Sequence, residues 1–399
     1  MRILFLNDAF PGRLGALAAC LAADPQHEVL FASSHCRQGF SLPGVRRVLL
    51  KKSKNTSTGQ NRDAFEQEWS WALKVGRLSL SSLLKLRAMN FTPDMVLTAS
   101  AKGHAFFVRQ VFPEAFYVSY LDDIFSPTCI TDRYSDRVLL RHLLQSGCLT
   151  QSQLFFVFSH WQKLFFPAFV RKAIEVVPFF ADTDFFCAEQ SGPFYCGEVN
   201  LSAVPELVSF SVTGVNAERG KVLCFMVMAL LRRRPHCHVL LSGVGPEFKA
   251  RLDAVVSRLS GEEAARLHCA GFLPLREYRD LLCASAAHIR LDVTDGRLGE
   301  LLEIMSCETL LMTLPHAAPE SAGILRPGEN MLFCPEAPAE EIYRRLEEML
   351  SRPEAFNTLR ANARKTALAF RQQDILSRHA VRLLKAYRQW KDGELCNVS

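Results

Sequence analysis

Short apolar runs and amphipathic helical segments alternate along this chain, stop, and then start again. In the first part we expect strands at residues 3–6, 28–32, 95–98, 116–120 and 154–158, with helical segments between them. Residues 187–206 have no clean period and contain both Pro and Gly. The alternation then resumes, with strands expected at residues 207–213, 239–241, 268–271, 288–291 and 310–313. Such alternation is typical of parallel sheets covered by helices on both faces, so the sequence predicts an α/β fold with two doubly wound, Rossmann-like domains.

The restart of the pattern sets the predicted domain boundaries. A chain of 399 residues exceeds what one ordinary hydrophobic core holds. We expect an N-terminal domain over residues 1–186, a linker over 187–206, a second domain over 207–365, and a C-terminal helix over 366–399 that packs back on the first domain. Ligands of such sheets lie at the carboxyl ends of the strands, so the cleft between two such domains can hold two substrates.

The composition excludes several classes of function. The chain has 47 Lys and Arg against 41 Asp and Glu. The RRRP run at residues 232–235 ends a predicted helix, where cations suit the dipole, and no aromatic residues are interleaved with it, so we expect no nucleic-acid partner. No stretch reaches 18 apolar residues, and Asn7 and Asp8 interrupt the first apolar run too early for a signal peptide. We therefore expect a cytoplasmic protein, and surface attachment to the inner face of a membrane stays open.

The cysteines point to free thiols rather than to a metal site. The chain has 13 Cys, and no pair is spaced as C-x-x-C. The run His236-Cys237-His238 is predicted to lie along a strand edge with its side chains alternating. We expect no metal and no other cofactor.

Two glycine-containing turns follow predicted strands. FPGRLG places Gly12 and Gly15 between the first strand and the first helix, and GVGPE places Gly243 and Gly245 in the same position of the second domain. Glycine there allows close approach of a ligand, such as a phosphate, or of a facing backbone. Each motif is equally compatible with a plain tight turn.

Two acids, Asp295 and Glu303, stand eight positions apart in DGRLGELLEIMSC. Glu303 lies inside an apolar helical run, where a carboxylate needs a partner or a pocket. It could accept hydrogen bonds from the vicinal hydroxyls of a ribose, while residues 296–299 offer free amides to an anion. The alternative is an acid near a helix start that the macrodipole favours.

Several segments together are similar to the retaining glycosyltransferases of family 4, which have the GT-B fold. MRILFLNDAFPGRLGALAACLAADPQHEVLFAS resembles their first βαβ unit, and PDMVLTASAKGHAFFVRQVFPEA a later part of the acceptor domain. SHWQKLFFPAFVRKAIEVVPFFADTDFF resembles their interdomain segment. AGFLPLREYRDLLCASAAHIRL, followed by LLEIMSCETLLMTLP and ILRPGENMLFCP, resembles the region around their paired acids. The resemblance runs over most of the chain in the family's order.

The resemblance implies roles for residues of the donor side. Glu303 would hold the ribose hydroxyls of a nucleotide sugar, Asp295 would meet the donor sugar, and Arg219 would neutralise the leaving diphosphate. The remaining donor-binding candidates are Gly243, Gly296, Leu298 and Gly299.

On the acceptor side the candidates are Gly12, His104 and Asp122. A histidine that the family often carries after its fourth strand aligns near Leu121, beside Asp122. The implied acceptor is the hydroxyl group of a glycan or a lipid-linked glycan, and the implied reaction retains the anomeric configuration, in cell-surface glycan assembly.

The chain departs from the family pattern at several positions, which keeps other hypotheses open. Thr213 stands where the first member of a basic pair is usual, Phe180 and Glu308 stand in place of glycines, and the first acid is Asp295 rather than Glu. A catalytically silent GT-B protein that partners an active transferase is one alternative, and a GT-B nucleotide-sugar epimerase is another. A dinucleotide oxidoreductase is disfavoured because no G-x-G-x-x-G follows a strand.

Overall fold

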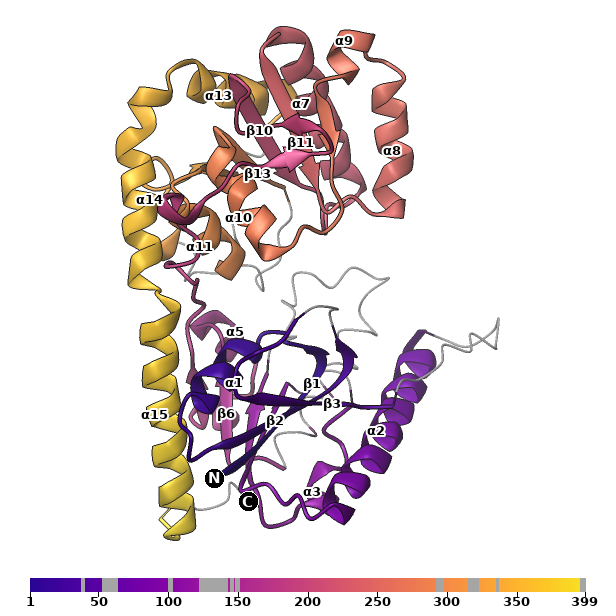
Figure 1. The fold of residues 1–399 in the computed structure, drawn as a ribbon, viewed down its shortest axis with the longest axis vertical. Helices are drawn as coiled ribbons and strands as arrows, with labels where there is room; N and C mark the ends of the chain where they lie inside the picture. Colours follow the sequence, from indigo (N-terminus) through magenta and orange to yellow (C-terminus); the bar gives the residue numbers. More distant parts are fainter. Residues whose placement is uncertain are drawn as a thin grey trace. The chain divides into compact units, whose positions relative to one another are not determined.

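The computed structural model describes residues 1–36, 40–51, 64–99, 103–121, 143, 147, 151–291, 298–314, 323–334 and 337–394. The chain divides into two compact units (Figure 1). Unit 1 comprises Met1–Pro178 and Gln373–Ser399, and unit 2 comprises Phe179–Gln372. Each unit has its own parallel sheet, which confirms the predicted α/β class with two Rossmann-like halves.

Unit 1 is built on a seven-stranded parallel sheet in the order β3-β2-β1-β4-β5-β6-β7. Its strands are β1 (Arg2–Phe10), β2 (Glu28–Cys36), β3 (Val45–Leu49), β4 (Met95–Ala99), β5 (Phe116–Tyr120), β6 (Leu154–Val157) and β7 (Ile174–Val176). The strand order reverses direction between β1 and β4, which makes their carboxyl ends the topological switch point of this sheet.

Helices cover both faces of this sheet, so its central strands are largely apolar. The helices are α1 (Gly15–Ala22), α2 (Ala64–Ala88), α3 (Val108–Val111), α5 (His160–Leu164), α6 (Ala168–Arg171) and α15 (Gln372–Lys391). Every residue of β5 and β6 is buried. A continuous apolar run is the pattern expected for a parallel strand with both faces covered.

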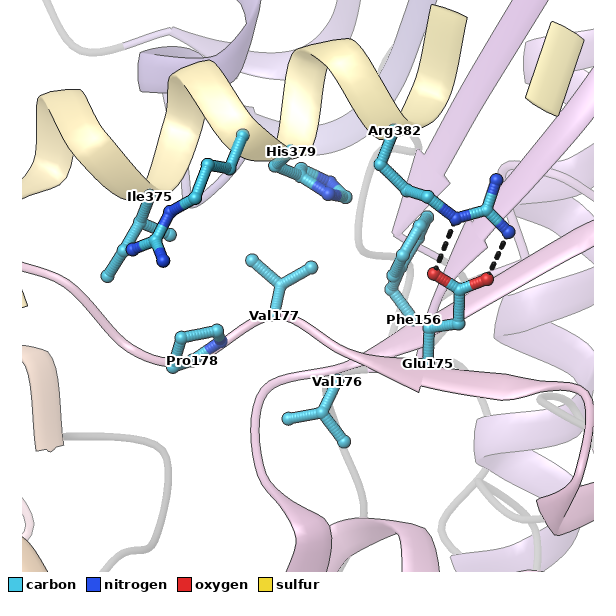
Figure 2. Close-up of a pocket in the computed structure, with 9 residues that line it drawn as sticks. Phe156, Glu175, Val176, Val177, Pro178, Ile375, His379 and Arg382 are labelled. Carbon is cyan, nitrogen blue, oxygen red and sulfur yellow. Dashed lines mark hydrogen bonds and ion pairs between the residues drawn. The ribbon is translucent and has the colours of Figure 1, made fainter. Parts of the chain in front are cut away.

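The C-terminal helix α15, drawn in yellow in Figure 1, packs on unit 1. The ring of His379 meets Phe156 edge-on at 4.5 Å, and its Nε2 lies 2.5 Å from the hydroxyl of Tyr120. Arg382 donates two hydrogen bonds to Glu175 (Figure 2). A hollow of about 240 Å³ remains between this helix and the end of β7.

Unit 2 contains a six-stranded parallel sheet in the order β12-β11-β10-β13-β14-β15. The strands are β10 (Glu206–Ser211), β11 (Cys237–Ser242), β12 (Leu267–Cys269), β13 (Ala287–Arg290), β14 (Leu310–Thr313) and β15 (Leu332–Phe333). The order reverses between β10 and β13, where Ser211 pairs with Arg290. Ligands of open α/β sheets bind outside the carboxyl ends of the strands at such a reversal.

The helices of unit 2 are α7 (Ala217–Arg233), α8 (Pro246–Val256), α9 (Gly261–Ala264), α10 (Leu275–Ala284), α11 (Leu298–Ser306), α13 (Ala339–Ser351) and α14 (Asn357–Ala369). One buried cluster joins α7 and α13 to the sheet, and a second joins α11 to α14. Arg364 of α14 donates hydrogen bonds to the backbone carbonyls of Thr183 and Phe186, which ties the start of this unit to its last long helix.

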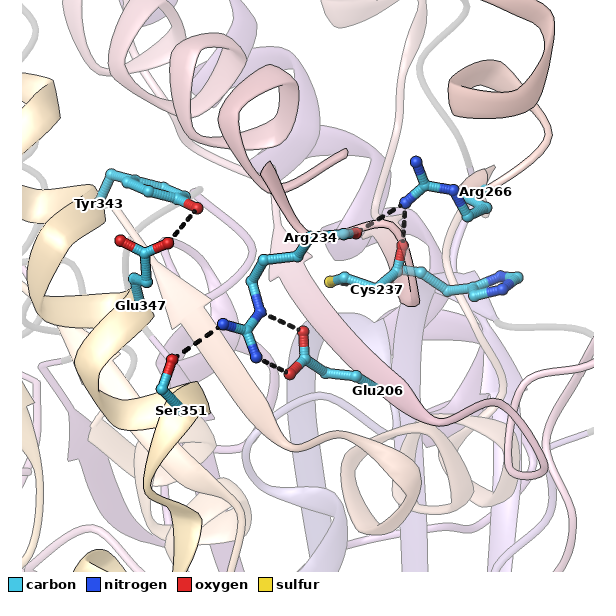
Figure 3. Close-up of polar contacts among 8 residues, drawn as sticks. Glu206, Arg234, Cys237, Arg266, Tyr343, Glu347 and Ser351 are labelled. Carbon is cyan, nitrogen blue, oxygen red and sulfur yellow. Dashed lines mark hydrogen bonds and ion pairs between the residues drawn. The ribbon is translucent and has the colours of Figure 1, made fainter. Parts of the chain in front are cut away.

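The amino-terminal edge of the same sheet is fixed by charged side chains (Figure 3). Arg234 donates two hydrogen bonds to the carboxylate of Glu206, at 2.7 and 2.6 Å, and a third to Ser351 at 3.0 Å. Arg266 donates to the carbonyls of Arg234 and Cys237. These bonds lie at the opposite edge from the switch point, so we assign them a structural role.

The predicted linker over residues 187–206 is wrong in position, because the units divide between Pro178 and Phe179. That stretch lies inside unit 2 and contains a hairpin of two short strands, β8 (Tyr195–Cys196) and β9 (Val199–Asn200). Phe194 and Leu201 are buried in a cluster with Leu207 and Leu240. Turns and two-residue strands have no hydrophobic period, so the sequence of this packed segment resembles that of a linker.

The point at which the chain returns from unit 2 to unit 1 also differs from the predicted boundary. Unit 2 ends at Gln372, so the predicted return segment, residues 366–399, begins inside α14. The helical segment expected between the strands at 116–120 and 154–158 falls largely outside the described residues.

We predict that His379 makes unit 1 lose stability in acid. Burial, and to a smaller extent the positive charge of Arg382, lowers the pKa of His379 from an ordinary value of 6.5 to about 4. Above pH 6.5 the imidazole is neutral in both states, whereas below it the unfolded chain binds a proton that the folded protein excludes. The free energy of unfolding should therefore fall as the pH drops, by about 2 kcal/mol at pH 5.

Urea unfolding between pH 7 and pH 5 measures this effect. His379→Gln should remove that part of the slope, while His236→Gln, a change of an exposed histidine, should leave it. Equal slopes for the wild type and His379→Gln would contradict the assignment.

Candidate functional site

The loops that leave the switch point of unit 2 gather most of the predicted donor-side residues. Thr213 and Gly214 follow β10, and Leu291 follows β13. The helices that begin after these loops, α7 and α11, point their N-termini toward the same edge. Backbone amides at a helix N-terminus, together with its dipole, favour an anion. Asp295 and Gly296 lie outside the described residues.

Arg219 reaches this edge from the first turn of α7. The helix is capped by Asn216, whose side chain accepts a hydrogen bond from the Arg219 amide at 3.0 Å. The half-buried guanidinium donates through Nη1 to the carbonyl oxygen of Leu291 at 3.3 Å. A positive charge is thereby held beside the carboxyl end of β13.

Gly243 follows β11 at the same edge, and close packing requires a residue without a side chain at this position. It has a φ of +76°, and a Cβ atom placed there would lie 2.2 Å from Oγ1 of Thr213. Any side chain at this position would displace the threonine. Gly243 is therefore explained by close approach of the two loops after β10 and β11.

Glu303 lies on α11, among the buried residues Leu301, Leu302, Ile304 and Met305. Its side chain is half-buried, and burial raises its pKa to about 8, with further contributions from the negative charges of Glu300 and Asp182. The positive charge of Arg290 lowers the pKa of Glu303, but this effect is smaller than the increase caused by burial. Near neutral pH the carboxyl group thus holds its proton. The isolated acid in an apolar run was the signal that identified this residue.

The first turn of α11 supplies the other donor-side candidates. Leu298 is buried at 5% exposure, so its side chain serves the core and only its backbone is available to a ligand. A Cβ atom on Gly299 would lie 3.4 Å from the carbonyl oxygen of Phe180. This is an ordinary van der Waals separation, so packing alone does not require glycine at this position.

An ion pair that the sequence analysis missed lies beside Glu303. Arg290, the last residue of β13, donates a hydrogen bond to the carboxylate of Glu300. The side chain of Arg290 is 1% exposed and that of Glu300 is 42% exposed. No local pattern in the sequence identifies this pair, because the burial of Arg290 follows only from tertiary packing.

The switch point of unit 1 carries a second cluster of polar residues. Oδ1 of Asp8 lies 3.3 Å from His104 Nε2 and 3.3 Å from His35 Nδ1. His104 is buried, and its Nδ1 lies 2.8 Å from the hydroxyl of Ser79. A carboxylate only accepts hydrogen bonds, so Nε2 of His104 carries a hydrogen, and in the neutral ring Nδ1 accepts from Ser79.

This cluster joins one predicted acceptor-side residue to two that were missed. Sequence reasoning named His104 but not Asp8 or His35, although Asp8 was conspicuous as a polar interruption of the first apolar run. Gly12 lies in the loop after β1 with a φ of +50°, and a Cβ atom there would clash with the Asn7 side chain at 2.5 Å. Asp122 lies outside the described residues.

Neither a metal cluster nor a spanning segment is found in the part of the chain that the structure describes. Within those residues no three His, Cys, Asp or Glu side chains are grouped to hold a metal ion. The helices among them are too short or too polar to cross a membrane. Cys237 is buried, and His238 stacks on His268 with 3.0 Å between Nδ1 and Nε2.

Comparison with known proteins gives a family match and a fold match. Residues 25–186 match the glycosyl transferase family 4 group. The whole chain is similar to HepE from Anabaena in complex with UDP-glucose, with a TM-score of 0.66 at 15% identity over 96% of this chain and 100% of that one. It is also similar to WaaG, a glycosyltransferase involved in lipopolysaccharide biosynthesis, with a TM-score of 0.64 at 13% identity over 95% and 98%.

A third similar structure belongs to a different class of enzyme. It is a putative UDP-N-acetylglucosamine 2-epimerase from Listeria monocytogenes, with a TM-score of 0.63 at 11% identity over 100% of this chain and 99% of that one. Comparison with curated protein sequences finds no significant match. The structural matches confirm the predicted GT-B fold, and the match over residues 25–186 supports the predicted class of glycosyltransferase.

We predict that Glu303→Gln stabilises the protein above neutral pH. The folded state keeps the proton of Glu303 up to about pH 8, whereas the unfolded chain releases it near its ordinary pKa of 4.5. The free energy of unfolding therefore falls as the pH rises from 4.5 to 8, and glutamine removes that loss. After allowance for screening of a half-buried group, the variant should gain roughly 2–4 kcal/mol at pH 8 and little at pH 4.5.

Chemical unfolding at both pH values measures the gain. Glu329→Gln, a change of an exposed carboxylate, is the matched control and should leave stability nearly unchanged at both. A Glu303→Gln variant no more stable than the wild type at pH 8 would show that the carboxyl group is not held neutral by the fold.

Proposed function

We propose that this glycosyltransferase moves a sugar from a nucleotide diphosphosugar to a hydroxyl acceptor with retention of the anomeric configuration. One observation carries the proposal: Arg219 and Glu303 lie on the two helices, α7 and α11, that follow the strands at the switch point of the second sheet. A cation for the diphosphate and a carboxyl group for the ribose are thus offered at the edge where such sheets bind nucleotides.

The chemistry requires stabilisation of the leaving group rather than a covalent intermediate. As the bond to the anomeric carbon breaks, negative charge develops on the departing diphosphate. Arg219 and the amides at the start of α11 are positioned to stabilise that charge. Asp295 would contact the donor sugar, and Glu303 would accept hydrogen bonds from the vicinal ribose hydroxyls. We propose that no metal ion takes part.

The polar cluster of unit 1 supports an acceptor site. Asp8 is half-buried at the carboxyl end of β1, and His104 and Ser79 fix its orientation through a chain of hydrogen bonds. An oriented carboxylate at this edge can accept a hydrogen bond from an attacking hydroxyl group. We propose a glycan or a lipid-linked glycan as the acceptor, in cell-surface glycan assembly.

A surface on α5 and α6 supports contact with a membrane face. Phe169 is 81% exposed and Leu164 is 57% exposed, and the sequence from 151 to 174 contains no acid. Lys163 and Lys172 lie in the same segment. Exposed apolar side chains flanked by cations suit the surface of an anionic bilayer. We propose a cytoplasmic protein that acts peripherally at the inner face of a membrane.

A catalytically silent GT-B partner of an active transferase is the second candidate. Thr213 carries no charge where the family resemblance implies one, and Glu308 has a φ of +58°, a conformation that favours glycine.

Incubation with UDP-glucose and other nucleotide sugars, with and without glycan acceptors, separates the active enzyme from the silent partner. Donor hydrolysis or transfer supports the enzyme. Binding without turnover supports the silent partner, and turnover to an epimer without acceptor supports the epimerase.

We predict that Arg219→Ala weakens binding of a nucleoside diphosphate more than binding of the nucleoside. The variant removes a charge-assisted contact that contributes roughly 1.5–3 kcal/mol, so the dissociation constant for UDP should rise at least tenfold. Calorimetric titration with UDP and uridine measures both. Arg232→Ala, which changes an exposed arginine at the other end of the same helix, serves as control. Equal losses for UDP and uridine would remove Arg219 from the anion site.

We predict that above pH 8, where Glu303 is ionised, Glu303→Gln weakens nucleotide binding about 10- to 100-fold, because the amide lacks the charge and one acceptor for the ribose hydroxyls. Ribose recognition favours the ionised carboxylate, so the affinity of the wild type should rise with pH up to about 8. The variant should show no such rise. A 2′,3′-dideoxynucleotide should bind the wild type poorly and lose little more from the substitution. Equal nucleotide affinity of the two proteins would overturn the ribose role.

A further inference from the structure

A groove of about 460 Å³ lies between helices α7 and α8 of unit 2, both labelled in Figure 1. The two helices bury one side in the same hydrophobic cluster against the sheet, through residues such as Leu223 and Phe248. The groove opens on their other side, because the residues of α7 that line it, apart from Gly220, are half-buried or exposed. None of the donor-side candidates in the part of the chain that the structure describes lines it. Its volume falls in the range of small-molecule pockets, about 300–1,000 Å³.

The floor of this groove is apolar. Cys224, Phe225 and Met228 line it from α7, and Ala254 lines it from α8. A helix with its side chains is about 10–12 Å wide and rises about 5.4 Å per turn, so the space of about 460 Å³ would hold about one turn of it. A partner helix would therefore lie across the mouth and leave the floor uncovered, whereas a single alkyl chain can enter. The shape favours one flexible apolar chain over a protein segment.

Three cations surround the apolar floor. Lys221 lies on α7, Arg251 lies on α8, and Arg258 follows the last turn of α8. The arginines at the carboxyl end of α7 pair with glutamates, but these three cations have no ion pair with any residue that the structure describes. The same helices carry the exposed acids Glu218 and Asp253, neither of which lines the groove. The charge around the groove therefore complements an anion.

A glycine leaves space for the guanidinium of Arg251 at the groove. Nη1 of Arg251 donates to the carbonyl oxygen of Asn216 at 3.4 Å, and a Cβ atom on Gly220 would lie 2.6 Å from the same Nη1. Glycine lowers the stability of a helix interior, and here its missing side chain gives the space that the guanidinium occupies. Burial raises the pKa of the Cys224 thiol, and the positive charge of Arg251 opposes that rise. The cation thus lies beside the apolar floor.

We propose that this groove binds one anionic single-chain lipid, with its alkyl chain on the apolar floor and a phosphate headgroup on Lys221 and Arg251. Burial of the chain removes apolar surface from water, and the cations form charge-assisted hydrogen bonds with the phosphate oxygens. Three cations match a phosphate better than a singly charged carboxylate. The inference goes beyond the proposed transfer reaction and does not depend on the donor site.

The form of the apolar residues favours a single lipid molecule over the face of a bilayer. On the surface of α5 and α6, Phe169 protrudes at 81% exposure, as suits insertion into a membrane. Phe225 is half-buried and forms part of the floor of a groove. A flat bilayer does not reach such a floor, whereas a chain that has left the bilayer does.

Calorimetric titration with dodecyl phosphate, below its critical micelle concentration, tests the inference. Dodecyl maltoside has the same chain without the charge, and inorganic phosphate has the charge without the chain. Dodecyl phosphate should bind about tenfold or more tightly than either, because only it satisfies both parts of the groove. A synthetic amphipathic peptide of Leu and Glu, titrated in parallel, tests a protein segment as the occupant.

Ala254→Phe fills the groove from an exposed position on the helix surface. The affinity for dodecyl phosphate should fall about tenfold or more, because the new ring takes the place of the alkyl chain. Ala250→Phe is the matched control. Ala250 is equally exposed one turn earlier on α8 but does not line the groove, so this variant should bind dodecyl phosphate as the wild type does.

Arg251→Gln tests the headgroup contact separately from the chain. It should weaken dodecyl phosphate about tenfold and leave dodecyl maltoside unchanged. Lys249→Gln, a change of an exposed cation on α8 that does not line the groove, should alter neither. Gly220→Ala keeps the charge but displaces the guanidinium, so it should also weaken dodecyl phosphate, and the alanine favours the helix.

Each result supports or overturns the inference. If dodecyl phosphate does not bind the wild type, or binds Ala254→Phe and Ala250→Phe equally well, the lipid site is wrong. If Arg251→Gln weakens dodecyl phosphate and dodecyl maltoside alike, the role of the cations is wrong. Binding of the peptide without binding of dodecyl phosphate would replace the lipid by a protein partner. Circular dichroism checks that each variant folds, and if Ala254→Phe does not, Arg251→Gln and Gly220→Ala decide.

Discussion

Parallel pairing of strands is the constraint on which the rest of this structure depends. A parallel pair cannot be joined by a tight turn, so each strand is followed by a crossover that returns the chain to the starting edge. All pairings in the two large sheets are parallel, and most residues of the central strands of both are buried. As a result, the loops that join strands to helices lie at one of the two edges of each sheet, where the strands begin or where they end. The carboxyl edge receives the helix N-termini, and the candidate residues for binding and catalysis lie there in both units.

The two sheets use this edge with different chemistry. In unit 1 the polar residues are carried by the strands themselves, since Asp8 lies within β1 and His35 within β2. In unit 2 most of them lie beyond the strands, on the first turns of α7 and α11. Side chains on strands are oriented by their neighbours, which suits a hydrogen-bonded cluster that positions a hydroxyl group. Helix N-termini offer amides and a dipole, which suits a diphosphate.

The helices and strands that could be predicted from the sequence have a clear hydrophobic period. Those that could not are short or lie at the edge of a sheet. The strands expected at 95–98 and 310–313 agree with β4 and β14 almost residue for residue. The strand β3, VRRVL, carries two arginines because it is an edge strand, and that pattern resembles a loop. The strand β1 continues to Phe10, past Asn7 and Asp8, which seemed to end it. These residues are polar although they lie in a central strand, because this end of β1 belongs to the candidate site rather than to the core.

The candidate site shows the same division. Glu303 could be found because an acid among buried leucines and isoleucine violates the apolar pattern of its helix. Arg290 could not, since an arginine at the end of a predicted strand is ordinarily exposed, and only tertiary packing makes it a buried cation. The contacts of His104 with Asp8 and Ser79 join residues 96 and 25 positions apart, which no local pattern encodes.

Burial of charge at the donor edge links the stability of unit 2 to its proposed chemistry. A half-buried carboxyl group with a pKa of about 8 and a guanidinium at 1% exposure are both unfavourable in a protein without ligand. The fold tolerates the first by keeping it protonated and the second by pairing it with a glutamate that reaches out to water. Ribose hydroxyls would hydrogen-bond to the carboxyl group of Glu303, so the ligand would offset the free-energy cost of burying it. Substitutions that stabilise the free protein at this position, such as Glu303→Gln, are therefore expected to weaken the binding.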